Sequence, residues 1–368
     1  MQRRRLRRNL TPANHPLQRW AGAWGNPVSP TMSAALRPQS TEARKRMRAI
    51  QVHETGGPDV LRYEEAPIPE PAPDQLRIKV VATGLNYIET YQRTGLYKLP
   101  LPFIPGSEFA GIVDAVGAEA QGWSVGERVA TASGIGGYAE YALAPAAKVV
   151  RVPEAIDLKL AAAVMLQGAT AHYLTHSTYP LKAGETCVVT AAAGGVGLLL
   201  VQMARRLGAR VIGLVSTEAK AALAREAGAD EVILYTQERF DQRVRAVTGG
   251  RGADVVYDSV GRSTWEQSLD SLRPRGYAVF FGNASGPVPP IEPLLLSMKG
   301  SLYLTRPTLA NYIATPEELA WRAGDLFAWM ASGALRVRVE REYPLSEAAE
   351  AHRALEGRQT TGKVLIVP

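Results

Sequence analysis

The stretch TAAAGGVGLLLVQ, residues 190–202, is the most informative part of this sequence because it places three glycines within four residues between two apolar runs. The run before it, TCVV, has the continuous apolar character of a buried parallel strand. The residues after it form an apolar stripe at helical spacing that ends at Gly208. A strand, a glycine turn and a helix form the context in which a G-x-G-x-x-G pattern binds a dinucleotide pyrophosphate. The stretch therefore predicts a dinucleotide-binding turn, and the alternative is a tight turn with purely structural glycines.

In the register of that pattern, alanine replaces the first glycine. The residues predicted to bind the pyrophosphate are Ala192, Gly194, Gly195, Val196 and Gly197.

Strands and amphipathic helices alternate after this turn. The predicted strands cover residues 186–191, 210–215, 231–235, 253–258, 277–282 and 301–305. Alternation with this spacing is typical of a parallel sheet with helices on both faces. The α/β pattern predicts a doubly wound Rossmann domain with a six-stranded parallel sheet.

Residues 47–153 have a different pattern, in which short strands are broken by glycine and proline. This pattern predicts a β-rich, barrel-like domain. After about residue 310 the chain continues as a helix, a strand, a helix at 346–356 and a last strand, KVLIVP. We therefore expect a catalytic domain of residues 47–170, completed by residues 310–368, with a nucleotide-binding domain inserted at residues 171–309.

The net charge of the 368-residue chain, +7, is unevenly distributed. Residues 1–46 contain nine arginines, Lys45 and a single acidic residue, so this basic extension carries +9 and the rest of the chain is close to neutral. We expect the extension to be disordered, and it is interpreted as a dispensable segment before a start at Met47, as a targeting segment, or as a functional basic arm. A near-neutral body does not predict nucleic-acid binding.

The apolar and cysteine content limits the location of the protein. The sequence has no continuous apolar run of about 18 residues, so we predict no membrane span. Its single cysteine, Cys187, rules out an intramolecular disulfide and favours a cytoplasmic location. Cys187 lies in a predicted strand and is interpreted as an inert core residue.

The end of the second predicted strand indicates which dinucleotide binds. An NAD site is expected to have an acidic residue there for the ribose hydroxyls, but the chain continues as Ser216-Thr217-Glu218-Ala219-Lys220. Lys220 falls in the first turn of the next helix, where the helix dipole disfavours a cation unless an anion is bound. Ser216 and Lys220 therefore predict a site for the 2′-phosphate of NADP(H). The alternative is a helix cap at Ser216 or Thr217 beside a solvated lysine.

Residues 47–368 resemble the zinc-independent medium-chain reductases, and most closely their NADPH:quinone reductase group related to zeta-crystallin. The resemblance rests on the segments GLNYIETYQRTGLY, PGSEFAGIVDAVG, TAAAGGVG, VVYDSVGRSTW, FFGNASG, KGSLYLTRPTL and GKVLIVP. It implies a GroES-like catalytic domain, a Rossmann domain and a homodimer formed through the edges of the Rossmann sheets. It also implies that the NADPH cofactor contacts Asn86, Thr90, Gln167, Thr170, Tyr173, Ser216, Lys220, Tyr235, Ser259, Phe281, Gly282, Asn283, Arg306 and Lys363.

The same resemblance bears on the chemistry. Zinc-dependent relatives carry histidine where this chain has Ser107, so we predict no metal site, and His172 and His176 are interpreted as packing or surface residues. Asn86, Tyr91 and Tyr97 are the candidate catalytic residues near a small-molecule quinone. A quinone is already electrophilic and needs a positioned hydride donor more than a Lewis acid. The alternatives are reduction of a conjugated enal or enone, and a non-catalytic nucleotide- or RNA-binding protein.

Overall fold

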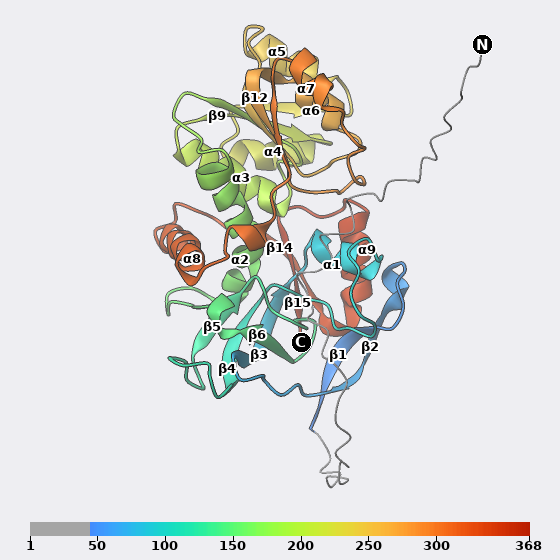
Figure 1. Ribbon diagram of the computed structural model, residues 1–368, viewed down its shortest axis with the longest axis vertical. Helices are drawn as coiled ribbons and strands as arrows, with labels where there is room; N and C mark the ends of the chain where they lie inside the picture. The colour runs from blue at the N-terminus through green and yellow to red at the C-terminus, as the bar shows by residue number, and fades with distance from the viewer. Residues whose placement is uncertain (1–44) are drawn as a thin grey trace, which may run out of the picture. The chain divides into compact units, whose positions relative to one another are not determined.

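The computed structural model describes residues 45–368 (Figure 1). The basic extension, apart from its last two residues, lies outside the described residues, so the predictions about it stay predictions. The described residues form two large sheets and a two-stranded ribbon of β1 (Arg46–Val52) with β2 (Leu61–Pro67).

The first large sheet confirms the predicted Rossmann fold. Its six strands are parallel and lie in the order β10-β9-β8-β11-β12-β13. The strands are β8 (Thr186–Val189), β9 (Arg210–Val215), β10 (Glu231–Leu234), β11 (Ala253–Asp258), β12 (Leu272–Phe280) and β13 (Tyr303–Thr305). This order, with the first strand in the middle, is the doubly wound arrangement whose ligands bind beyond the carboxyl ends of the strands.

Helices connect these strands in sequence. They are α3 (Gly195–Arg206), α4 (Glu218–Glu226), α5 (Phe240–Val247), α6 (Trp265–Asp270) and α7 (Pro293–Met298). The largest difference from the predicted bounds is at β12, which begins at Leu272 and not at residue 277, while the other strand ends lie within two residues of their predictions. Leu272 pairs with Ala253 ahead of a register shift, and Pro274 and Gly276 interrupt the apolar pattern by which a strand is predicted.

The second large sheet is built from both ends of the described chain. Its strands lie in the order β14-β15-β3-β4-β5-β7, and β6 also pairs with β3. They are β3 (Gln75–Gly84), β4 (Phe109–Val116), β5 (Arg128–Thr131), β6 (Tyr141–Pro145), β7 (Val149–Arg151), β14 (Val339–Pro344) and β15 (Lys363–Val367). The pairing of β15 with β3 brings the C-terminal residues beside the start of α1 (Tyr87–Arg93). The expected domain boundaries themselves stay predictions.

The remaining helices surround this sheet. They are η3 (Pro58–Val60), η4 (Ala146–Lys148), η6 (Leu309–Asn311), α8 (Pro316–Ala331), η7 (Leu345–Glu347) and α9 (Ala348–Glu356). Helix α2 (Leu158–Tyr173), which continues as the single π-helical turn η5 (Leu174–Thr178), packs on β3, β4 and β5 and also on α3 (Figure 1). Its Ala161, Ala162 and Ala163 are fully buried, and short side chains allow this close approach.

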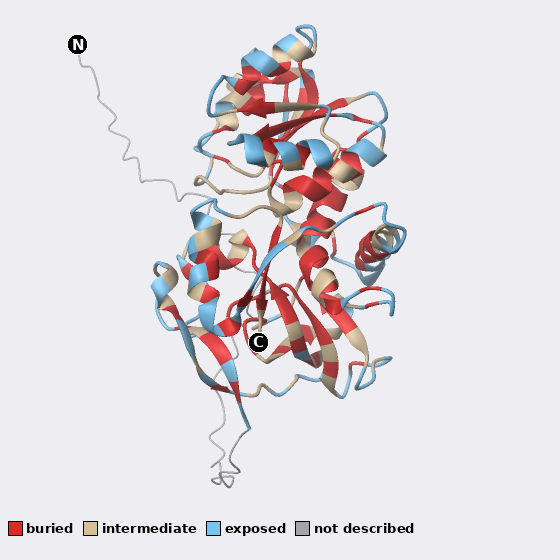
Figure 2. Ribbon diagram, turned by 180° about the vertical axis from the view of Figure 1, so that it is seen from behind, coloured by how far each residue is buried: buried red, intermediate tan, exposed pale blue. Residues whose placement is uncertain are grey.

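One apolar cluster therefore runs from the second sheet through α2 into the Rossmann sheet. Figure 2 shows the buried residues concentrated on the strands and on α2. Cys187 lies in this core, and burial raises the pKa of its thiol, as expected for an inert core residue.

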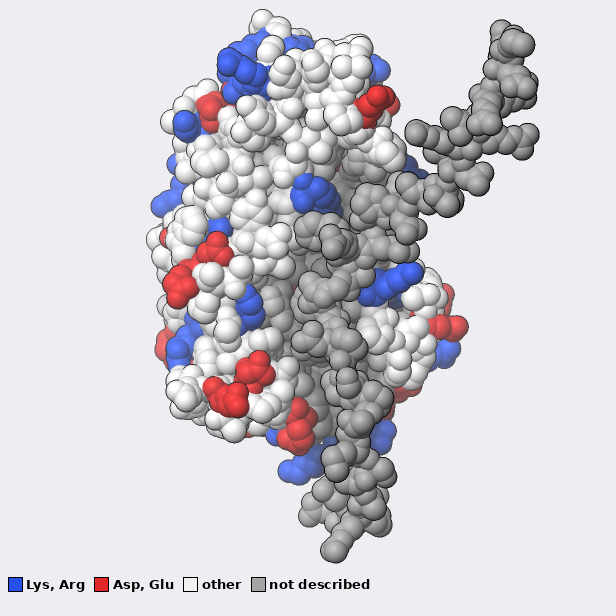
Figure 3. Space-filling model, in the orientation of Figure 1, with Lys and Arg blue, Asp and Glu red and all other residues white. Residues whose placement is uncertain are grey.

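Figure 3 shows one face of the molecule, on which basic and acidic side chains of the described residues are interspersed and neither charge predominates. None of the helices between residues 45 and 368 is both long and apolar enough to cross a bilayer.

Candidate active site

The glycine turn lies directly beyond the carboxyl end of β8 and leads into α3. Ala191 adopts φ +48°, a left-handed conformation, and Gly194 is the N-cap of the helix. A Cβ on Gly197 would lie 2.8 Å from the Cα of Ala192, so only glycine lets the helix pack this closely on the turn. The free N–H groups of the first turn of α3 then point towards any anion bound there.

A second element, α2, packs against the same turn. A Cβ on Gly195 would lie 2.5 Å from Cδ of Gln167, so the Gln167 amide rests directly on the glycine backbone. Thr170 and Tyr173 follow Gln167 at three-residue spacing on the same helix, and all three side chains are buried. The structure thus brings Gln167 beside the predicted pyrophosphate site.

Asn86 joins this cluster from the other sheet. Gln167 Nε2 donates to Asn86 Oδ1 at 3.3 Å, and Lys363 Nζ donates to the same oxygen at 2.8 Å. Asn86 Nδ2 donates to Glu108 Oε2 at 2.8 Å and to the carbonyl oxygen of Gly84 at 3.0 Å. The whole amide of Asn86 is therefore held by protein groups, and its predicted contact with the cofactor stays a prediction.

Glu89 fixes the start of α1. Its carboxylate accepts the backbone N–H of Asn86 at 2.9 Å and the backbone N–H of Ser107 at 3.2 Å. The side chain is fully buried, and this desolvation raises the pKa of Glu89 to about 7, against the smaller lowering effects of the Ser107 hydrogen bond and the Lys363 charge. Glu89 therefore ties the start of α1 to the loop that carries Ser107.

Two buried side-chain oxygens, one on α2 and one on α1, have no hydrogen-bond partner among the described residues. Neither Gln167 Oε1 nor Thr90 Oγ1 forms a hydrogen bond to any of the described residues. Such groups are costly to bury unless a ligand or water satisfies them. Together with the bare glycine backbone, they fit the polar groups of a dinucleotide.

Tyr91 bridges the two sheets. Its hydroxyl accepts the backbone N–H of Asn283, beyond β12, at 3.0 Å. Burial raises the pKa of Tyr91 to about 12, so the phenol keeps its proton at neutral pH. Tyr97 lies edge-on to Tyr91, with ring centroids 5.3 Å apart, and is 40% exposed. The structure brings Tyr91, Tyr97 and Asn283 together and leaves the Tyr91 O–H free to donate.

The other strand ends gather around the same turn. Ser259 N donates to Thr190 Oγ1 at 2.9 Å, and a Cβ on Gly282 would lie 3.0 Å from Cα of Ser259. Phe281 immediately follows β12, and its N–H bonds the carbonyl of Asp258 at 2.8 Å. These contacts hold the loops that carry the predicted cofactor residues of β11 and β12 close together.

The loop after β13 approaches from the side of α2. Burial raises the pKa of both Tyr91 and Tyr173, and the positive charge of Arg306 partly offsets this effect on each of them. Tyr173 stacks on Tyr312, with ring centroids 4.3 Å apart. Arg306 is therefore near both tyrosines that are predicted to face the reactants.

The proposed phosphate end is formed by the tips of β9 and β10. Thr217 caps α4 by accepting the Lys220 N–H at 3.3 Å, so the predicted alternative of a helix cap holds for Thr217. The Lys220 ammonium donates to the carbonyl oxygen of Arg358 at 2.8 Å, and desolvation lowers its pKa. The Ser216 carbonyl accepts the Thr236 hydroxyl at 3.1 Å, which places Tyr235 beside this end.

Sequence reasoning missed three residues of the site. Arg358, which has φ +56°, accepts from Lys220 through its carbonyl oxygen. The pKa of Lys220 is lowered mainly by desolvation, and the negative charge of Glu340, which raises it, has a larger effect than the positive charge of Arg358. Glu89 and Glu108 are buried partners of Asn86. An isolated acid within the apolar segment PGSEFAGIV was the available signal for Glu108, since a carboxylate is rarely buried unless it is paired.

The two conspicuous histidines form a structural network away from this site. His172 Nε2 contacts Asp325 Oδ2 at 2.9 Å, and its Nδ1 contacts the Arg322 guanidinium at 2.9 Å. His176 stacks on His172, with ring centroids 4.2 Å apart. These contacts agree with a packing role for both rings. Within residues 45–368, no group of three or more His, Cys, Asp and Glu side chains is arranged to hold a metal ion.

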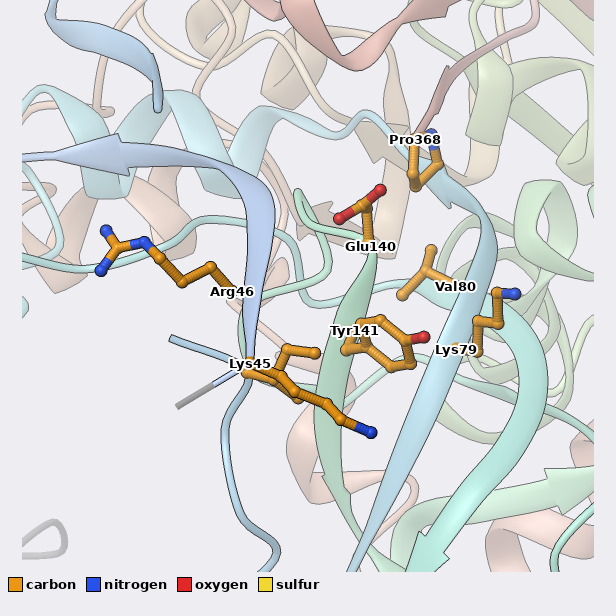
Figure 4. A pocket seen from close by; sticks show the side chains of 8 residues that line it. Lys45, Arg46, Lys79, Val80, Glu140, Tyr141 and Pro368 are labelled. Atoms are coloured by element: carbon orange, nitrogen blue, oxygen red, sulfur yellow. The ribbon is translucent and has the colours of Figure 1, made fainter. Parts of the chain in front are cut away.

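A separate pocket of about 510 Å³ lies at the ribbon and the C-terminus. Its walls are formed by Lys45, Arg46, Ile68, Lys79, Val80, Glu140, Tyr141 and Pro368 (Figure 4). None of these residues belongs to the site at the glycine turn.

Comparisons with known proteins show which families this chain resembles. The chain matches the family models of the alcohol dehydrogenase GroES-like domain over residues 72–154 and of the zinc-binding dehydrogenase over residues 195–321. It is 49% identical over 323 residues to a quinone oxidoreductase of Pseudomonas aeruginosa, a match that covers 87% of this chain and 99% of that protein. It is 42% identical over 329 residues to a 2-haloacrylate reductase of Burkholderia sp., covering 87% of this chain and 98% of that protein.

A solved structure is similar over the same region. The crystal structure of Escherichia coli quinone oxidoreductase complexed with NADPH has a TM-score of 0.85 and 44% sequence identity with this chain. The match covers 87% of this chain and all of that one.

Proposed function

This chain belongs to the medium-chain dehydrogenase/reductase family, in its quinone oxidoreductase group, and on that premise we propose that it transfers hydride from NADPH to a quinone without a metal. The observation that supports the proposal is the contact of Gln167 with the glycine turn at Gly195, where its amide oxygen has no hydrogen-bond partner among the described residues. The E. coli relative, whose structure is a complex with NADPH, supports the choice of cofactor.

The residues that would hold the cofactor lie at two ends of one site. The first turn of α3 would bind the pyrophosphate through backbone N–H groups. Lys220, Arg358 and Ser216 would bind the 2′-phosphate, Gln167 would satisfy a polar group beside the glycine turn, and Thr90 would do so at the nicotinamide end. When bound, NADPH supplies the hydride.

The chain's own part in the reaction is to orient the acceptor and stabilise its charge. Tyr91 keeps its proton, and with its oxygen accepting from Asn283 its O–H is free to donate to a quinone oxygen that gains negative charge. Tyr97, edge-on to Tyr91, adds an aromatic surface on which a flat ring can stack.

A second candidate is reduction of an activated carbon–carbon double bond. The 42% identity to a 2-haloacrylate reductase favours it, and hydride delivery to a conjugated acceptor needs the same positioning. The third alternative, a nucleotide- or RNA-binding protein, depends on the basic extension and remains a prediction.

We also propose that the protein is a cytoplasmic homodimer that pairs through β13. This strand is last in the order of the six-stranded sheet, and its Tyr303 and Leu304 are 52% and 38% exposed. Leu294 and Met298 of α7 are also exposed. An unpaired apolar edge strand is a template for a second copy, and sedimentation analysis of the purified protein tests this.

An acceptor panel tests the proposed activity. NADPH oxidation would be followed with a naphthoquinone, with 2-chloroacrylate and with a conjugated enone, in buffer containing a chelator. The proposal predicts the highest kcat/KM for the quinone. A higher value for chloroacrylate or the enone would replace it with the second candidate, and loss of activity in chelator would contradict the metal-free reaction.

A further inference from the structure

The Lys363–Glu108 ion pair is the most buried pair of opposite charges at the site described above. Their side chains are 1% and 0% exposed, and Lys363 Nζ lies 2.5 Å from Glu108 Oε2. Taking both charges out of water is expensive, and such a pair often adds less stability than an apolar replacement would. A buried pair of this kind is well suited to fixing one arrangement of neighbouring groups.

The neighbours use every polar atom of the pair. Lys363 Nζ donates to Glu108, to Asn86 Oδ1 at 2.8 Å and to the Leu85 carbonyl at 3.2 Å, which accounts for three ammonium hydrogens. Glu108 Oε1 accepts the backbone N–H of Leu166, on α2, at 2.7 Å. The pair thus ties the start of β15 and the residue before β4 to α2 and to the N-cap of α1, Asn86.

That amide can adopt only one orientation. The carbonyl oxygen of Asn86 faces the Lys363 ammonium, and its NH₂ group faces the Glu108 carboxylate. Rotation of the amide by 180° would place its NH₂ group against the ammonium and its oxygen against the carboxylate. Because Asn86 Oδ1 also accepts from Gln167 Nε2, the Gln167 amide is turned so that Oε1 is the atom left over.

The leftover Oε1 faces the glycine turn. A Cβ on Gly195 would lie 2.6 Å from Gln167 Nε2 and closer still to Oε1. Lys363 itself follows Gly362, whose N–H bonds the Ala193 carbonyl of the turn at 3.0 Å. The charged pair and the turn are therefore connected both through the backbone and through the two amides.

We propose that Lys363 and Glu108 are positioning residues that orient Asn86 and Gln167, so that Gln167 offers a hydrogen-bond acceptor to the cofactor beside the glycine turn. This inference rests on the proposed NADPH binding and adds the residues that orient the polar groups of the binding site. It assigns Lys363 to an indirect role through Asn86, in place of the direct cofactor contact predicted from the resemblance.

The test compares the whole cofactor with its adenosine half. Dissociation constants for NADPH, from its fluorescence, and for 2′,5′-ADP, from calorimetry, would be measured for the wild type and the double variant K363M/E108Q. The double variant leaves no unpaired buried charge and so avoids the largest cause of unfolding. Circular dichroism checks that it is folded.

Two further variants complete the design. Gln167→Ala removes the acceptor without touching the ion pair. K159M is the matched control, because Lys159 forms an exposed pair with Glu342 at 2.6 Å, with side chains 40% and 42% exposed.

We expect NADPH affinity to fall about tenfold or more in K363M/E108Q and in Q167A, as for loss of a buried hydrogen bond. Affinity for 2′,5′-ADP should remain within about twofold in both, and K159M should bind both ligands like the wild type. Equal losses for the two ligands would show a general structural role and overturn the inference, as would unchanged NADPH binding. Failure of the wild type itself to bind NADPH would instead overturn the proposed function.

Discussion

Replacing Gly195 by alanine probes the contact on which the cofactor site depends. The new Cβ would lie 2.5 Å from Cδ and 2.6 Å from Nε2 of Gln167, well inside van der Waals contact. Because the obstacle is a flexible side chain, we expect Gln167 to rotate away while the backbone of α3 stays in place. The rotation breaks the 3.3 Å hydrogen bond to Asn86 and turns the unpartnered Oε1 away from the turn.

The substitution Gly195→Ala has two opposite effects on the free energy of unfolding, and they nearly cancel. The lost hydrogen bond costs about 0.5–1.5 kcal/mol. Alanine at an unstrained helical position restricts the unfolded chain and returns about 0.4–1 kcal/mol. The free energy of unfolding should therefore change by less than about 1 kcal/mol. NADPH affinity should fall about tenfold or more, which is about 1.4 kcal/mol, because the methyl group also narrows the approach of the pyrophosphate.

Urea unfolding and fluorescence titration with NADPH measure these two quantities. Gly324→Ala is the matched control, since Gly324 lies in α8 and a Cβ there meets nothing within 4 Å. If Gly195→Ala bound NADPH as tightly as Gly324→Ala, Gln167 and the glycine turn would not form the cofactor site. A large loss of stability in Gly195→Ala would show that Gln167 cannot move as argued.

Three other predictions follow from the same geometry. Tyr91→Phe removes the O–H proposed to donate to the quinone, so kcat should fall about 10- to 100-fold with little change in the Kd of NADPH; an unchanged kcat in steady-state assays would remove Tyr91 from the mechanism. Lys220→Gln should reduce the NADPH-over-NADH ratio of kcat/KM about tenfold, since it removes one of the charges proposed to bind the 2′-phosphate, and an unaltered ratio would place that phosphate elsewhere. Burial lowers the pKa of His172 to about 4 from its ordinary 6.5, so its contribution to stability is complete above about pH 6.5 and is lost as the pH falls towards 4. Burial also lowers the pKa of His176 and His352, so urea unfolding should show an acid loss that is smaller in His172→Gln by on the order of 3 kcal/mol, and parallel profiles would contradict this.

Local patterns predicted the nucleotide-binding part of the fold well. The glycine turn after an apolar strand and the regular alternation behind it were sufficient for the six-stranded parallel sheet, because each signal lies within a few residues of the element it specifies. The unusual position of Lys220 in a first helical turn was likewise readable, although its contact with Arg358 was not.

The buried polar network could not be predicted in the same way. Glu108 and Lys363 lie 255 residues apart in sequence, and only the pairing of β15 with β3 brings the lysine to the carboxylate. The early start of β12 was hidden by Pro274 and Gly276, which read as loop residues. Both cases depend on tertiary contacts that leave no periodic trace in the sequence.

Cofactor preference is best measured as the ratio of kcat/KM for NADPH and NADH, with the same quinone and the purified protein in a chelator. We predict turnover with a preference for NADPH of about tenfold or more, as the proposed 2′-phosphate contacts of Lys220 and its neighbours require. Folded protein that oxidises neither nucleotide with the quinone, or that prefers NADH, would contradict this prediction.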